Sequence, residues 1–256
     1  MPGAQTHLAA VCNLLASPAV NDLFPHLSAE GEARSAFLLG AVSPDVRAVS
    51  RQAREETHFF AIPPQGEAPA QAVMLARWPE LHSAPTRDSL RAAFVAGYIT
   101  HLVMDQTWVE MIVMPSLFIE GRSWGVFHPR WRTYSLLMAY LEDQASRYLS
   151  GALAEQLVRA EPRGWLPFVR DRHLIQWRDH VAGILSTGGI RPLARMFALS
   201  NGMPVGKLET IIRSEERMEA EVYRHVPREQ VTAFEAETTR RSQQAVTAYL
   251  LGRQEG

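Results

Sequence analysis

The stretch from about Thr86 to Met114 restricts the fold more than any other part of the chain. Its middle, Phe94-Val-Ala-Gly-Tyr-Ile-Thr-His-Leu-Val-Met-Asp, is apolar on almost every face when it is wound as a helix. A helix that is hydrophobic all round is buried, so the rest of the chain must pack around it. Thr86 or Asp88 is the candidate N-cap of this helix.

Two polar side chains interrupt this apolar stretch. His101 and Asp105 are four residues apart, which places both on one face of the helix, one turn apart. A buried carboxylate without a partner is costly, so Asp105 requires a cation, a hydrogen-bond donor or a metal ion beside it. A structural His–Asp hydrogen bond within the core is one explanation of the pair, and a metal site is the other.

Helical periodicity dominates the remainder of the chain, and clean two-residue alternation is almost absent. We therefore predict an all-α protein, with one helical domain over residues 1–256. Its motif-bearing core covers about 1–150, and the C-terminal helices in 151–252 pack on this core. The expected helices cover about 4–16, 30–41, 51–60, 70–78, 86–114, 131–149, 151–160, 168–186, 190–199, 205–225 and 228–251, with loops at 63–69 and 115–129.

The cysteine count and the charge exclude several classes of site and partner. One cysteine, Cys12, permits neither an intramolecular disulfide nor a cysteine-based zinc site. A formal net charge of −1 gives no basic surface, so no nucleic-acid partner is expected. No apolar run approaches the roughly 20 residues that cross a bilayer. No signal peptide is recognised at the N-terminus, so a cytoplasmic location is expected.

Three more potential ligands lie among nonpolar residues outside the core helix. Asp45 follows the turn Ser43-Pro44, and proline disfavours helical geometry in the residue before it, so Asp45 is expected just past a helix end. His58 precedes an aromatic pair, and His7 lies on the apolar side of the first helix. Zinc accepts imidazole nitrogen and carboxylate oxygen, and mixed sets of these ligands suit catalytic sites with open positions. The predicted zinc site consists of His7, Asp45, His58, His101 and Asp105.

Four motifs in this order resemble those of the zinc-dependent phospholipase C family, whose helical fold and metal arrangement the S1/P1 nucleases share. The resemblance covers roughly residues 1–110. The motifs are Thr6-His7, Leu39-Gly-Ala-Val-Ser-Pro-Asp45, Thr57-His58-Phe59 and Phe94-Val-Ala-Gly-Tyr-Ile-Thr-His101-Leu-Val-Met-Asp105.

The resemblance implies a cluster of three zinc ions that hydrolyses phosphate esters. Asp45, His58, His101 and Asp105 would surround one zinc ion. His7 and Asp105 would bind a second, with Asp105 bridging the two. In the secreted enzymes of the family the mature N-terminal tryptophan also binds this second ion. No signal peptide precedes a tryptophan here, so this ligand is expected to be missing or replaced.

The third family zinc uses a histidine after the long helix and a His-x-x-x-Glu pair on the next helix. His128 matches the first histidine, and Glu142 matches the glutamate. The residue four positions before Glu142 is Met138, a poor zinc ligand. The resemblance therefore implies between one and three zinc ions, with the third site incomplete.

Two hypotheses for function follow. In the first, the protein is a zinc-dependent hydrolase of phosphate esters, similar to phospholipase C, that acts on a small-molecule or lipid substrate. Asp45 would then orient or deprotonate the attacking water, or act only as a ligand. Glu55 or Glu56 would either orient an imidazole or lie exposed in solvent.

In the second hypothesis, the chain is a helical metal-binding or structural protein whose site is catalytically weak or inactive. Met138 and the missing tryptophan favour this alternative. A nuclease-like activity is a third interpretation, and the neutral charge counts against it.

Overall fold

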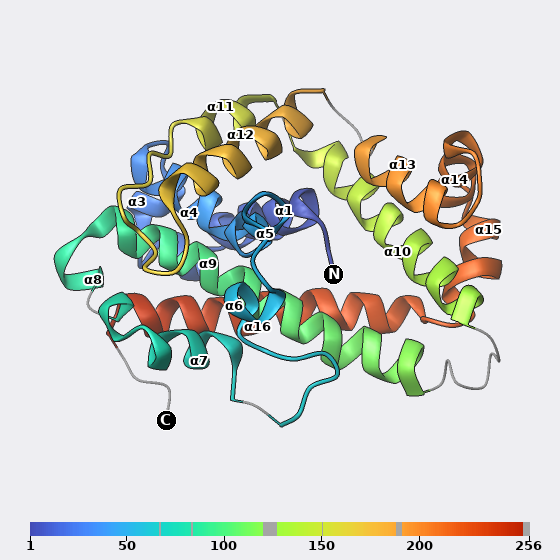
Figure 1. The fold of residues 1–256 in the computed structure, drawn as a ribbon, viewed down its shortest axis with the longest axis horizontal. Coiled ribbons are helices and arrows are strands. Elements are labelled where there is room, and N and C mark those ends of the chain that lie inside the picture. Colours follow the sequence, from blue (N-terminus) through green and yellow to red (C-terminus); the bar gives the residue numbers. More distant parts are fainter. Residues whose placement is uncertain (67, 83, 120–126, 150, 188–190, 253–256) are drawn as a thin grey trace.

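Helices form all the regular secondary structure in the part of the chain that this computed structural model describes, residues 1–66, 68–82, 84–119, 127–149, 151–187 and 191–252 (Figure 1). The all-α prediction is therefore confirmed. The elements, in chain order, are α1 (Ala4–Ala16), α2 (Pro18–Asn21), α3 (Pro25–Ser28), α4 (Glu32–Val42), η1 (Ser43–Val46), α5 (Arg47–Ser50), α6 (Arg54–His58), α7 (Ala70–Arg77), η2 (Pro79–Leu81), α8 (Ala84–Arg87), α9 (Ser89–Trp108), η3 (Val109–Ile119), α10 (Phe127–Tyr148), α11 (Gly151–Val158), α12 (Asp171–Thr187), α13 (Arg191–Ser200), α14 (Val205–Ile212), α15 (Glu215–Met218), η5 (Glu219–Tyr223) and α16 (Arg228–Leu250).

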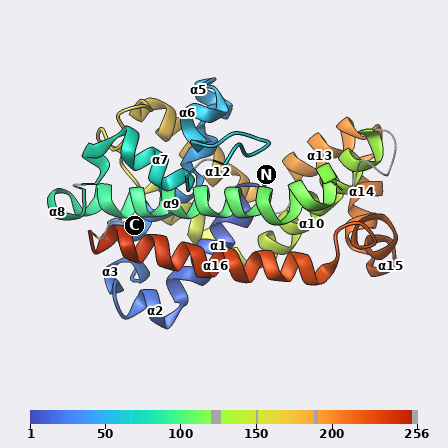
Figure 2. The same cartoon turned by 90° about the horizontal axis from the view of Figure 1, so that it is seen from below.

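The core helix α9 begins where the sequence predicts it. Of the two candidate caps, Asp88 is the one that acts: its Oδ1 accepts hydrogen bonds from the backbone N–H groups of Leu90 at 3.1 Å and Arg91 at 3.0 Å. The side chains from Ala92 to Asp105 are all buried. In Figure 2 α16 lies along α9. Helix α4 also packs against α9.

The end of this helix differs from the expectation. The sequence predicts a loop from residue 115, but the chain continues as the π-helical segment η3 to Ile119, with Pro115 inside it. A π-helical turn already departs from the i→i−4 hydrogen bonding that proline would break, so proline is tolerated there. By length and composition alone, the continuous helix from Ser89 to Ile119 is able to cross a membrane, although most of its apolar stretch is buried inside the protein.

Helices α4 and α9 touch through their backbones at two glycines. A Cβ atom on Gly40 would lie 2.0 Å from the carbonyl oxygen of Phe94, and one on Gly97 would lie 2.0 Å from the carbonyl oxygen of Phe37. Only glycine permits so close an approach of two helix backbones. The contact fixes the C-terminal end of α4 against the middle of α9, where His101 lies.

One continuous hydrophobic cluster joins the N-terminal and C-terminal helices. It includes Leu8 of α1, Val181 of α12, and Phe234 and Tyr249 of α16. The C-terminal region contains more helix breaks than expected. A single helix is predicted over 205–225, but α14 ends at Ile212, and α15 begins after the N-cap Ser214. The core nevertheless holds the helices that carry the candidate ligands in fixed relative positions.

Candidate metal centre

His101 lies at the middle of the site and is oriented by α4. Its Nδ1 is 2.9 Å from the carbonyl oxygen of Ala41. Because a carbonyl only accepts hydrogen bonds, Nδ1 carries a proton, and Nε2 is the ring nitrogen that faces the site. This Nε2 lies 3.6 Å from Oδ2 of Asp105, one turn further along α9. Both side chains are completely buried.

His7 of α1 approaches the same carboxylate from the other side. Its Nε2 is 3.4 Å from Oδ1 of Asp105. Its ring stacks on that of His101, with 3.7 Å between centroids and 7° between planes. Burial, followed by the proximity of His101, lowers the pKa of His7 to about 4. At neutral pH His7 is therefore an uncharged imidazole, the form that binds metal.

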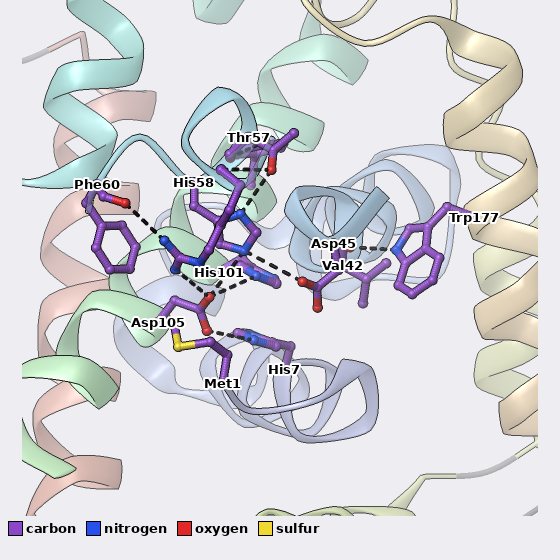
Figure 3. A network of polar contacts seen from close by, with 12 residues as sticks. Met1, His7, Val42, Asp45, Thr57, His58, Phe60, His101, Asp105 and Trp177 are labelled. Atoms are coloured by element: carbon purple, nitrogen blue, oxygen red, sulfur yellow. Dashed lines mark hydrogen bonds and ion pairs between the residues drawn. The ribbon is translucent and has the colours of Figure 1, made fainter. Parts of the chain in front are cut away.

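His58 lies between the two carboxylates, as Figure 3 shows. Its Nε2 is 3.3 Å from Oδ2 of Asp105 and 3.6 Å from Oδ1 of Asp45. Burial acts to lower the pKa of His58, but the nearby carboxylates of Asp105 and Asp45 raise it above its usual value. The position between these carboxylates therefore attracts positive charge, either a proton or a metal ion.

The backbone around His58 directs its ring into the site. Helix α6 ends at His58 because Phe59 adopts a left-handed conformation, with φ at 61°. The hydroxyl of Thr57 donates to the carbonyl oxygen of Arg54 at 3.3 Å, so it accepts from Nδ1 of His58, 2.9 Å away. The tyrosine hydroxyl of Tyr98 in turn donates to the Thr57 carbonyl at 2.6 Å. His58, like His101, thus presents Nε2.

Asp45 comes from the turn η1, and it is the most exposed of the five residues, with 30% of its side chain accessible. Burial acts to raise its pKa, but the nearby rings of His58 and His101 hold it at about 2. Asp45 is therefore a carboxylate at neutral pH. It forms the solvent-facing edge of the cluster.

An indole on α12 holds the turn that carries Asp45. The Nε1 group of Trp177 donates a hydrogen bond to the carbonyl oxygen of Val42 at 2.7 Å, in the buried interior (Figure 3). We expect Trp177→Phe to lower the free energy of unfolding by about 2 kcal/mol, because the Val42 carbonyl loses its donor and the smaller ring leaves a gap.

A matched control is Trp131→Phe, because the Nε1 of Trp131 bonds to Ser200 in an exposed position. This change is expected to alter the free energy of unfolding by less than about 0.5 kcal/mol, and urea titration measures this free energy for both variants. Equal losses in the two variants would contradict a specific role for the Val42 contact.

The ligand atoms form two groups that share His101. The atoms of His7, His101 and Asp105 all lie within 4.8 Å of one another, and so do those of Asp45, His58 and His101. Within the described residues, Nε2 of His7, Nε2 of His101 and both oxygens of Asp105 have no hydrogen-bond partner although they are buried. Unsatisfied buried groups of this kind are expensive, and one or two cations would satisfy them together. The donor set therefore fits a metal ion.

The residues expected at a third metal position are arranged differently. Oε1 of Glu142 accepts hydrogen bonds from the backbone N–H of Thr6, at 2.9 Å, and from its hydroxyl, which holds the first turn of α1 beside His7. Burial raises the pKa of Glu142. Met138 is buried in the hydrophobic core, and the side chain of His128 lies outside the described residues. Glu142 belongs to neither of the two ligand groups.

Sequence reasoning missed one charged residue of the site. Arg54, the first residue of α6, places Nη2 3.7 Å from Oδ2 of Asp105. Its position four residues before His58 puts both on one face of α6, and this spacing is the signal that the sequence offered. Glu55 and Glu56 are exposed, and Glu56 accepts from the backbone N–H of Ala53 at 2.8 Å, so Thr57 and not a glutamate orients His58.

A cavity of about 550 Å³ lies between α1, α10 and α16. It is lined by Thr6 but by none of the five cluster residues. The accessible edge of the cluster is therefore at Asp45 and not in this cavity.

The chain matches no protein-family model, no curated protein and no solved structure. The geometry by itself defines an all-helical protein with a buried His/Asp cluster able to hold a metal ion.

Proposed function

We propose that this protein is a metal-dependent hydrolase of phosphate esters, with zinc as its metal and a fold of the phospholipase C type. The observation that carries the proposal is the convergence of five ligand-type side chains from four segments on one buried point. Their order along the chain is also the order of the four motifs that resemble the zinc-dependent phospholipase C family.

The chemistry of the donors favours zinc over the harder cations. Three imidazoles and two carboxylates make up the cluster, whereas magnesium and calcium take oxygen ligands almost exclusively. We assign Asp45, His58 and His101 to one ion, and His7 and Asp105 to a second, with Asp105 between them. His128 and Glu142 remain the candidate ligands of a third ion.

A bound zinc ion would polarise the phosphoryl group and lower the pKa of a nearby water molecule. Asp45 is then suited to orient that water, because it is anionic at neutral pH and is the carboxylate nearest to solvent. His58 and His101 keep their positions through hydrogen bonds to Thr57 and Ala41. Burial of the remaining ligands excludes bulk water from the inner side of the cluster.

The test is hydrolysis of bis(4-nitrophenyl) phosphate by protein whose zinc content has been measured. We expect turnover with zinc and none after chelation. Asp45→Asn is expected to lower kcat by at least about 100-fold, the lower range of a general acid–base contribution. Zinc content of the variant, measured by mass spectrometry, separates loss of a ligand from loss of catalysis.

A second function is favoured by two observations at the expected third metal position. Met138 is apolar at a position where the family has a ligand, and Thr6 occupies one oxygen of Glu142. A protein that binds zinc tightly but hydrolyses neither phosphodiesters nor phosphomonoesters would be a helical metal-binding protein with an inactive site. The substrate, whether a lipid or a soluble phosphoester, and the cytoplasmic location remain proposals.

A further inference from the structure

Arg54 points a guanidinium group at the cluster and is held there from two directions. Its Nη1 donates a hydrogen bond to the carbonyl oxygen of Phe60 at 3.0 Å. Its planar group lies over the Phe60 ring, 4.3 Å from the centroid. Only 17% of the side chain is exposed. These two contacts orient the guanidinium group, and neither of them uses Nη2.

The Nη2 atom of Arg54 has no hydrogen-bond acceptor among the described residues. Nη2 of Arg54 is buried and unsatisfied, with Oδ2 of Asp105 3.7 Å away as its nearest ion-pair partner. A buried N–H group without an acceptor is costly, and a cationic one more so. Arg54 therefore keeps a buried N–H group without an acceptor beside the cluster.

The charge count shows what kind of acceptor fits. Two carboxylates, Asp45 and Asp105, face one guanidinium, Arg54. With neutral imidazoles, and with the amino group of Met1, whose pKa burial lowers, also neutral, the cluster carries one net negative charge. The two divalent ions assigned above would change this to three net positive charges. Arg54 and the ions then repel each other in a poorly screened interior unless an anion lies between them.

We propose that Arg54 binds a non-bridging oxygen of the substrate's phosphoryl group, so that the negative charge of a phosphodiester offsets part of the positive charge of the metal-loaded site. The proposal rests on the proposed function, because it assumes that the cluster holds a divalent ion. Arginine suits this role, since its N–H groups match phosphoryl oxygens in direction and it stays charged at any relevant pH. The competing explanation is that Arg54 only neutralises Asp105.

The experiment compares Arg54→Met with Arg51→Met. Arg51 is exposed, lies three residues earlier and carries the same charge, so its removal controls for net charge. Each zinc-loaded protein is titrated with inorganic phosphate by calorimetry, and zinc affinity is measured separately with a competing chelator. Arg54→Lys forms a third variant, which keeps the charge and loses the planar group.

We expect Arg54→Met to bind phosphate about 10- to 100-fold more weakly, as for a lost hydrogen bond to a charged group. Arg54→Lys should fall between this variant and the wild type, and Arg51→Met should match the wild type. Zinc affinity should stay the same or rise in Arg54→Met, because a repelling cation is removed. KM for bis(4-nitrophenyl) phosphate should rise in parallel with the loss of phosphate affinity.

Wild-type phosphate affinity in Arg54→Met, together with normal zinc binding, would overturn the proposal and leave the hydrolase function intact. Equal losses in Arg54→Met and Arg51→Met would also overturn it, since they would reflect net charge alone. If the wild-type protein takes up no zinc, the proposed function itself fails, and the role of Arg54 falls with it.

Discussion

Asp105→Asn is expected to abolish high-affinity zinc binding, with a loss of at least about 100-fold. Asp105 is the one residue of the cluster that lies within 3.7 Å of His7, His58, His101 and Arg54 alike. An amide at this position removes the negative charge and turns one acceptor oxygen into a donor. Loss of a group that merely supports a ligand already costs 10- to 100-fold in metal affinity, so loss of the central carboxylate costs more.

Zinc affinity is measured by competition with a chromophoric chelator, and the thermal midpoint is recorded with and without zinc. The control is Asp143→Asn, which removes another buried carboxylate that pairs with Arg147 and Arg213 away from the cluster. Asp143→Asn should lose stability but keep wild-type zinc affinity. If Asp105→Asn bound zinc as well as the wild type, the His–Asp contacts would be a purely structural feature of the core.

Gly97→Ala is expected to destabilise the protein by about 3 kcal/mol or more, or to prevent folding. The new methyl group would lie 2.0 Å from the carbonyl oxygen of Phe37 and 3.0 Å from the backbone nitrogen of Ala41. Both obstacles are backbone atoms, so no side-chain rotation relieves the clash. Helices α4 and α9 must then separate. Urea denaturation of the metal-free protein gives the free energy of unfolding.

Gly183→Ala is the matched control, because Gly183 lies inside α12 and a Cβ there meets nothing within 4 Å. Alanine at this position should stabilise the helix by about 0.5–1 kcal/mol. A partly folded Gly97→Ala protein should also bind zinc more weakly, since His101 is oriented by the Ala41 carbonyl across the same helix contact. Similar stabilities of the two variants would contradict the close packing of α4 and α9.

The sequence predicts those parts of the site that depend on local pattern. The apolar helix, its cap at Asp88 and the pairing of His101 with Asp105 all follow from residues within one segment. The structure also brings His7, Asp45 and His58 to the same point, as the motif order suggested.

Features that depend on contacts between distant segments could not be read from the sequence in the same way. Arg54 lies 3.7 Å from Asp105 although the two are 51 residues apart, and it is held there by Phe60, which follows the left-handed Phe59. Glu142 contacts Thr6 across 136 residues, and a short acidic segment of α10 gives no local sign of that partner. The π-helical extension past Met114 escaped prediction because proline normally ends helical hydrogen bonding.

Exposure changes across the cluster, from the accessible edge at Asp45 to the fully enclosed pair of His7 and Asp105. If both positions bind an ion, one that arrives from solvent would meet the outer position at Asp45 first. Loading and stripping should follow a fixed sequence in time, with a chelator extracting the outer ion quickly and the inner ion only after the outer one has left. The folded chain would thus act as a kinetic trap for its innermost metal, whatever the equilibrium affinities of the two positions.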